Sequence, residues 1–220
     1  MPSPNKPIVL IRGVHPLEIS ARYIAKLVYE ELERRGHDTR LITYPYRSTL
    51  LSHGLKPDIS EEGIMIDGFD GLLERNGLVS YETFYHDFHN YKLPDDFGSR
   101  KPYFTICEDS LFENCKSGNI LYNFNHSWYY DENDEEYEII DGVTYEIPAY
   151  FKDMPERIMR MAKTKVLTSS SPQYDKIVVD FLKTKRNGFM DDTVVELLVE
   201  ETLRIHQEYP SPVERFVDED

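Results

Sequence analysis

Cysteine is scarce in this 220-residue chain, which contains only Cys107 and Cys115. Two cysteines cannot build a disulfide scaffold, and the metal-binding CxxC pattern does not occur. Basic residues are also outnumbered, 25 against 40 acidic ones, which gives a net charge of -15. The longest basic cluster is Lys183–Arg186, so the chain offers no patch suited to the phosphates of nucleic acid. We therefore expect no nucleic-acid partner.

Long apolar runs are absent as well. No run approaches the roughly 18 residues of a membrane-spanning helix, and Met1–Pro7 lacks the basic and apolar regions of a signal peptide. The sequence therefore predicts a cytoplasmic protein without a membrane partner. A content of 40% hydrophobic and 30% charged residues is typical of a globular protein, and we expect one domain over residues 1–220. The motifs GxGxxG, GxxxxGK[ST], HExxH and GxSxG are also missing.

A strand–helix–strand pattern is present near the start of the chain. The short apolar run Pro7–Ile11 predicts a buried strand, and apolar residues at helical spacing predict a helix over about Pro16–Arg35. Gly36 is expected to end that helix, and Arg40–Tyr44 reads as a second strand. This unit predicts an α/β fold with parallel strands.

Further elements are predicted from apolar and β-branched patterns along the rest of the chain. Strands are expected over Val79–His89, Tyr103–Cys107, Asn119–Phe124 and Val143–Ile147, the last stopped by Pro148. Helices are expected over about 154–164, 172–185 and 192–208, and Ser60–Glu62 could open a short one. Asp131–Glu138 is expected to form an exposed hairpin or loop, and the tail after Tyr209 to be loosely held.

The segment Gly13–Glu18 lies where the first strand gives way to the first helix, which is where open α/β sheets bind ligands. His15 and Glu18 are three residues apart, a spacing that can turn both side chains toward one point. Imidazole and carboxylate are both zinc ligands, and a catalytic zinc needs a third protein ligand. The alternative is a loop histidine and an acid favoured by the first helical turn.

Two later segments add candidates for the same chemistry. His89 is expected near a strand end with Asp87 on the same face, as when a carboxylate orients a metal-binding histidine. Glu146 lies in a β-rich run, where a buried carboxylate is costly unless it has a role, such as that of a general base. The alternatives are a polar strand end and an outward-facing position on an edge strand.

Together these segments resemble the zinc carboxypeptidases and their aspartoacylase and succinylglutamate desuccinylase branch, over about residues 8–150. Gly13–Ala21 looks like the GxHxxE segment, Asp87–Asn90 is similar to the DLHN strand end, and Val143–Glu146 resembles the strand of the catalytic glutamate. The resemblance implies a compact three-layer fold, with helices on both faces of a mixed, largely parallel sheet. It also implies one zinc ion per chain.

In that family pattern His15, Glu18 and His89 would bind the zinc, and Glu146 would be the catalytic residue. Asp87 would support His89. Asn125–Trp128 looks like the HSY segment of the carboxypeptidases, so His126 is a rival third ligand or a pocket residue. His86 is a weaker candidate, because strand alternation points it away from the face of His89.

Substrate choice is the least determined property. The arginine-rich segment with which these families hold a substrate carboxylate is not intact, and Arg47 and Arg75 are the candidates in that interval. The sequence predicts a zinc-dependent hydrolase of an amide bond, in an N-acyl amino acid or at a peptide C-terminus. The alternatives are a non-catalytic protein of the same fold that binds a metal or small molecule, and an α/β protein without a metal. The oligomeric state is not predicted.

Overall fold

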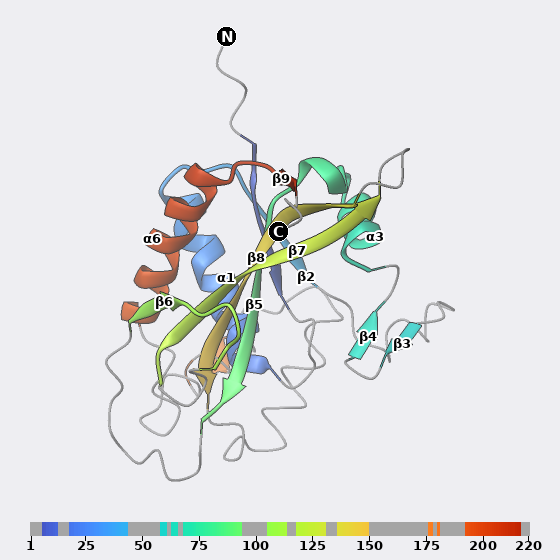
Figure 1. Ribbon diagram of the computed structural model, residues 1–220. Helices are drawn as coiled ribbons and strands as arrows, with labels where there is room; N and C mark the ends of the chain where they lie inside the picture. The colour runs from blue at the N-terminus through green and yellow to red at the C-terminus, as the bar shows by residue number, and fades with distance from the viewer. Residues whose placement is uncertain are drawn as a thin grey trace.

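The computed structural model describes residues 6–12, 18–43, 58–60, 63–65, 68–93, 105–113, 118–130, 136–149, 176–177, 180 and 192–216. Its centre is a seven-stranded sheet in the order β2-β1-β5-β8-β7-β6, with β9 paired to β8 (Figure 1). These strands are β1 (Ile8–Arg12), β2 (Thr39–Thr43), β5 (Tyr85–Lys92), β6 (Ile106–Glu108), β7 (Ile120–Tyr130), β8 (Glu136–Ala149) and β9 (Val213–Phe216).

Helices and short elements surround the sheet. They are α1 (Ile19–Arg34), α3 (Gly68–Arg75), the 3-10 turn η1 (Ser80–Glu82), α6 (Asp192–Glu208) and the hairpin of β3 (Asp58–Ser60) and β4 (Gly63–Met65). Within the ranges that the structure describes, no helix is long and apolar enough to cross a membrane.

The predicted strand–helix–strand unit is confirmed. Strand β1 is fully apolar and buried up to Arg12, and it pairs in parallel with β2. Gly36 follows α1 with a φ of 87°, a left-handed conformation that glycine adopts without strain. The chain can therefore turn sharply from the end of α1 into β2.

Sheet pairing confirms an α/β fold with a mixed, largely parallel sheet. Strand β1 is parallel to both β2 and β5, β5 is parallel to β8, and β6 is parallel to β7. Among the described strands of this sheet, only the pairs of β8 with β7 and with β9 are antiparallel. Strands β1, β5 and β8 therefore lie side by side. Strand β5 carries Asp87 and His89, β8 carries Glu146, and β1 precedes Glu18 in the chain.

Two layers of helix cover the sheet. Helices α1 and α6 pack on one face, where Ile24, Val28 and Leu198 share a buried cluster with Phe88 and Tyr145 (Figure 1). Helix α3 packs on the other face through a second cluster, formed by Leu72, Leu73, Val9, Ile11, Ile42 and Tyr85. Successive residues of β5 and β8 therefore point alternately into two different environments.

Several predicted boundaries were wrong. Val79–Thr83 is not strand, because η1 occupies part of it and β5 begins only at Tyr85. Ser60 belongs to β3 instead of opening a helix. Strand β8 continues through Pro148, which is tolerated because β8 has no β7 partner beyond Glu146.

Glu136–Glu138 belongs to β8 and pairs with β7, so this end of the acidic segment lies in a hairpin, one of the two forms expected for it. The tail after Tyr209 is not loose throughout, because Val213–Phe216 forms β9 against β8. Helix 192–208 is confirmed as α6. The helices expected at 154–164 and 172–185 lie mostly outside the described residues.

Candidate active site

The candidate residues meet where β5 extends past its neighbour. Strand β1 ends at Arg12 opposite Phe88, whereas β5 continues to Lys92. Glu18, at the start of α1, reaches this overhanging part of β5. On the other side, β8 runs parallel to β5 and places Glu146 directly opposite His89. Three segments far apart in the sequence thus converge on His89.

His89 lies between two carboxylates. Its Nδ1 is 3.1 Å from Oε2 of Glu18, and its Nε2 is 2.6 Å from Oδ2 of Asp87. The side chains are 12% exposed for His89, 17% for Glu18 and 3% for Asp87. The backbone N–H of Phe88 donates to the other Asp87 oxygen, Oδ1, at 2.8 Å. Asp87 is therefore fixed in place and in turn fixes the ring of His89.

Glu146 is an interior residue of the sheet. It lies on β8 between Leu121 of β7 and His89 of β5, and both of those residues are its register partners. The prediction that β8 could be an edge strand with Glu146 facing outward is therefore wrong. Its Oε2 atom is buried and has no hydrogen-bond partner among the described residues. Such an atom is costly unless a ligand or an ion contacts it.

The surroundings shift the pKa of both central groups. Burial lowers the pKa of His89, but the carboxylates of Asp87 and Glu18 raise it more, to about 11. Burial raises the pKa of Glu146 to about 7, helped by the negative charges of Glu18 and Asp87 and opposed by His89. A carboxyl group with a pKa near 7 can both accept and donate a proton at neutral pH.

The geometry of Glu18 and His89 fits a shared zinc ion. Two atoms that each lie about 2.0–2.1 Å from one tetrahedral zinc are about 3.3 Å apart. The 3.1 Å between Glu18 Oε2 and His89 Nδ1 is close to that spacing. Apart from this contact with His89, Glu18 Oε2 is buried and has no hydrogen-bond partner among the described residues. The donor types and the orphaned oxygen therefore both suit a cation.

The described residues alone do not complete a metal centre. Among them, no group of three or more His, Cys, Asp and Glu side chains is arranged to hold a metal ion. His15, the third ligand expected from the sequence, lies outside the described residues. The structure thus brings together Glu18, His89, Asp87 and Glu146 from the predicted set.

Other predicted residues lie elsewhere. His126 is five residues beyond Leu121 along β7, about 17 Å from the level of Glu146 at the usual strand rise, and it pairs with Glu138. Arg75 is exposed at the end of α3, which leads through η1 to the start of β5 rather than to its far end. Arg47 lies outside the described residues.

His86 faces the opposite side of β5, as strand alternation predicts. It is fully buried in the core under α6, and its Nδ1 lies 3.1 Å from the hydroxyl of Tyr145. Burial lowers the pKa of His86 well below its usual value. His86 and His89, three residues apart on one strand, are therefore a neutral core histidine and a charged site histidine.

Sequence reasoning missed Asn90. This side chain is only 5% exposed, and it contacts both the start of α1 and strand β8. The available signal was an amide in a predicted strand, on the same face as His86 and Phe88 by simple alternation. A polar residue in such a position is retained when its hydrogen bonds are specific.

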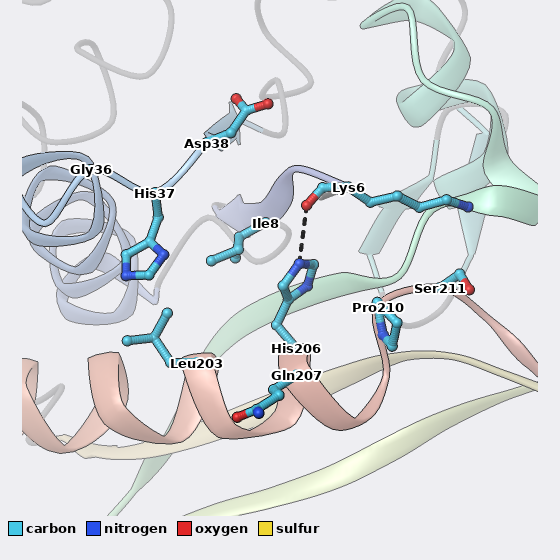
Figure 2. Close-up of a pocket in the computed structure, with 10 residues that line it drawn as sticks. All are labelled: Lys6, Ile8, Gly36, His37, Asp38, Leu203, His206, Gln207, Pro210 and Ser211. Carbon is cyan, nitrogen blue, oxygen red and sulfur yellow. Dashed lines mark hydrogen bonds between the residues drawn. The ribbon is translucent and has the colours of Figure 1, made fainter. Parts of the chain in front are cut away.

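A hollow of about 790 Å³ opens at the opposite end of the sheet from His89, where strand β1 begins. Its walls include Ile8, His37, Leu203 and His206 (Figure 2). The Nε2–H of His206 donates to the backbone carbonyl of Lys6 at 3.1 Å. The amino group of Lys6 donates to a backbone carbonyl of η1 instead of pointing into the hollow. These two hydrogen bonds join chain segments at the hollow.

Comparisons with known proteins leave the family open. No protein-family model matches the chain, and no curated protein or solved structure shows significant similarity to it. The functional argument therefore depends on the geometry around His89.

Proposed function

We propose that this protein is a zinc-dependent hydrolase of an amide bond, acting on an N-acyl amino acid or on the C-terminus of a peptide. The observation that carries the proposal is the placement of His89. Its Nδ1 lies 3.1 Å from Glu18, its Nε2 is held by Asp87, and Glu146 stands opposite it on β8. In this proposal Glu18 and His89 would be a pair of metal ligands, Asp87 the orienting carboxylate and Glu146 the general base.

Glu18 and His89 would hold the zinc ion, with His15 as the third ligand expected from the sequence. A bound zinc ion would supply Lewis-acid polarisation of the scissile carbonyl and make water easier to deprotonate. The substrate would enter beside Glu146, at the end of the sheet where β5 and β8 extend beyond β1. This position agrees with the general location of ligands in open α/β sheets.

Asp87 would determine which ring nitrogen of His89 is free of a proton and able to bind zinc. A carboxylate 2.6 Å from Nε2 keeps the proton on that nitrogen. The lone pair of a singly protonated imidazole is then on Nδ1, which faces Glu18. Asp87 itself cannot turn away easily, because its second oxygen accepts the Phe88 N–H.

Glu146 would move the protons. With a pKa of about 7, its carboxylate can take a proton from the attacking water and return it to the leaving amine. The carboxylate is held by the backbone of a central strand, so its position relative to His89 is set by the parallel register of β5 and β8. Its unpartnered Oε2 is the oxygen that could take on this task.

The same geometry supports membership of the carboxypeptidase and aspartoacylase fold. The chain order is a strand, the start of a helix with Glu18, a strand with His89, and a strand with Glu146. This is the order that the sequence resemblance implies. The mixed sheet with helices on both faces is compatible with the three-layer fold of that family.

A second candidate function is acid–base chemistry without a metal. It is favoured by the electrostatic balance of the site, because a protonated His89 between Asp87 and Glu18 forms a paired group by itself. In that case His89 would remain charged and orient a substrate, while Glu146 would exchange protons. Turnover that persists in a strong zinc chelator would support this candidate over the first.

The decisive functional test compares Glu146→Gln with wild type on a panel of N-acyl amino acids and peptides. We expect both proteins to bind zinc equally, and the variant to lose about 10²–10⁴-fold in turnover because the general base is gone. Glu138→Gln is the matched control, since Glu138 lies in the same hairpin but contacts His126. Normal hydrolysis by Glu146→Gln would contradict the assigned role. Full zinc occupancy without hydrolysis of any substrate would favour a non-catalytic metal-binding protein.

A further inference from the structure

Asn90 connects the three segments that carry the candidate active site. Its Oδ1 accepts hydrogen bonds from the hydroxyl of Ser20 and from the backbone N–H of Ala21, both at 2.7 Å. Its Nδ2 donates to the backbone carbonyl of Ile147 at 2.9 Å. Ser20 and Ala21 follow Glu18 closely in α1, and Ile147 directly follows Glu146 in β8. Asn90 itself directly follows His89.

The start of α1 depends on this contact. The residue before the helix is Glu18, and its side chain makes no capping hydrogen bond. The first amides of a helix have no partner within the helix, and a capping side chain normally accepts from the third of them. Here that third amide belongs to Ala21, and its acceptor comes from β5. Asn90 thus acts as a helix cap supplied by another strand.

A further contact of Asn90 reaches strand β8, the third of the three segments. Asn90 and Ile147 are register partners, just as His89 and Glu146 are. The Asn90 amide therefore adds a side-chain bond to the parallel pairing, directly beside the site. The backbone pairing already holds β8 beside β5, whereas an apolar side chain at this position could not hold the start of α1 at a defined distance from β5.

We propose that Asn90 is a positioning residue, which sets the distance between Glu18 and His89. This inference rests on the proposed function for its effect on zinc, but the geometric part stands without it. Loss of the carboxamide would release the first turn of α1, and Glu18 would move away from Nδ1 of His89. Supporting residues behind metal ligands typically change metal affinity by about 10–100-fold.

The test measures zinc affinity by competition with a chelating dye, on Asn90→Ala and on Thr202→Ala as the matched control. Thr202 is fully buried and its hydroxyl contacts Tyr145, so its loss also weakens the core but leaves the site untouched. We expect Asn90→Ala to lose at least tenfold in affinity while still folded, and Thr202→Ala to stay within twofold of wild type. An Asn90→Ala protein that melts earlier but binds zinc like wild type would overturn the proposal.

A metal-free measurement separates this inference from the proposed function. Cross-relaxation between the side-chain protons of Glu18 and the ring protons of His89 should be seen in wild type and in Thr202→Ala, and lost in Asn90→Ala. Asn90→Asp keeps the acceptor for Ser20 and Ala21, so it should keep the signal. Persistence of the signal in Asn90→Ala would overturn the positioning role. If wild type and the variants show this pattern but wild type binds no zinc, the zinc hydrolase is refuted and the positioning role of Asn90 stands.

Discussion

His89 Nδ1 lies 3.1 Å from Glu18 Oε2 because β5 continues past the end of β1 and meets the start of α1 there. The other nitrogen of His89 is held by Asp87, which belongs to the same strand face. A histidine in this position has two possible states. It is either an imidazolium between two carboxylates, or a neutral ligand that shares a cation with Glu18.

These two states differ by one proton, so zinc binding should release it. In the metal-free protein the pKa of His89 is about 11, and the ring is therefore charged at pH 7. A zinc ligand must be neutral imidazole, so binding at pH 8.5, where Glu146 is already ionised, should displace about one proton from His89. Calorimetric titration in buffers of different ionisation enthalpy measures this number. A binding enthalpy that does not depend on the buffer would contradict the assignment of His89 as a ligand.

Removing the charge of Asp87 should weaken the metal site without unfolding the protein. In Asp87→Asn the amide can still accept from the Phe88 N–H, but its NH₂ group cannot accept the Nε2 proton of His89. We expect zinc affinity to fall by about 10–100-fold. Asp141→Asn is the control, because Asp141 lies on the paired strand β8 and its Oδ2 accepts from Ser127. Equal affinities in both variants would show that Asp87 has no orienting role.

The activity should rise with pH as Glu146 loses its proton. Its pKa is about 7 in the metal-free site, mainly because burial disfavours the charged carboxylate. A bound cation nearby favours the charged form, so the rising limb of kcat/KM should lie below pH 7 in the zinc-loaded protein. The limb should be unchanged in Glu138→Gln. A kcat/KM that is flat between pH 4 and 8 would argue against Glu146 as the base.

His86 should make the protein sensitive to acid. Burial keeps its pKa in the folded protein well below the value of about 6.5 in the unfolded chain. Below pH 6.5 the unfolded chain therefore binds more protons, and the free energy of unfolding should fall by up to about 1.4 kcal/mol per pH unit. Urea denaturation of wild type and His86→Phe at several pH values measures this slope. His206, whose pKa burial also lowers, remains in both proteins. Identical slopes would contradict the assignment of His86 as a neutral core residue.

The parts of the fold that the sequence predicted well are governed by local patterns. Strand β1, helix α1 and helix α6 follow from apolar periodicity, and Gly36 marks the end of α1 through its positive φ. Helix α3 was missed, because Gly68 and Gly71 weaken the helical signal of that segment. Strand β9 was missed because its partner, β8, is distant in the sequence and two prolines precede it.

The candidate site was predictable in part, because some of its residues also follow from local sequence patterns. Asp87 and His89 share a face through simple alternation, and Glu18 follows from its position at the start of a helix. That Glu146 stands opposite His89 depends on the strand order β1-β5-β8, which no local pattern specifies. The contacts of Asn90 likewise depend on how α1 and β8 meet β5.

Zinc content tests the central claim most directly. Elemental analysis of protein incubated with zinc and then desalted should find about one zinc per chain in wild type. His89→Ala and Glu18→Ala should each lose the metal while remaining folded by circular dichroism. His126→Ala should keep it, because His126 lies on the outer part of the β7–β8 hairpin and pairs with Glu138. Wild type without zinc, or variants of His89 and Glu18 that retain it, would contradict the proposed site.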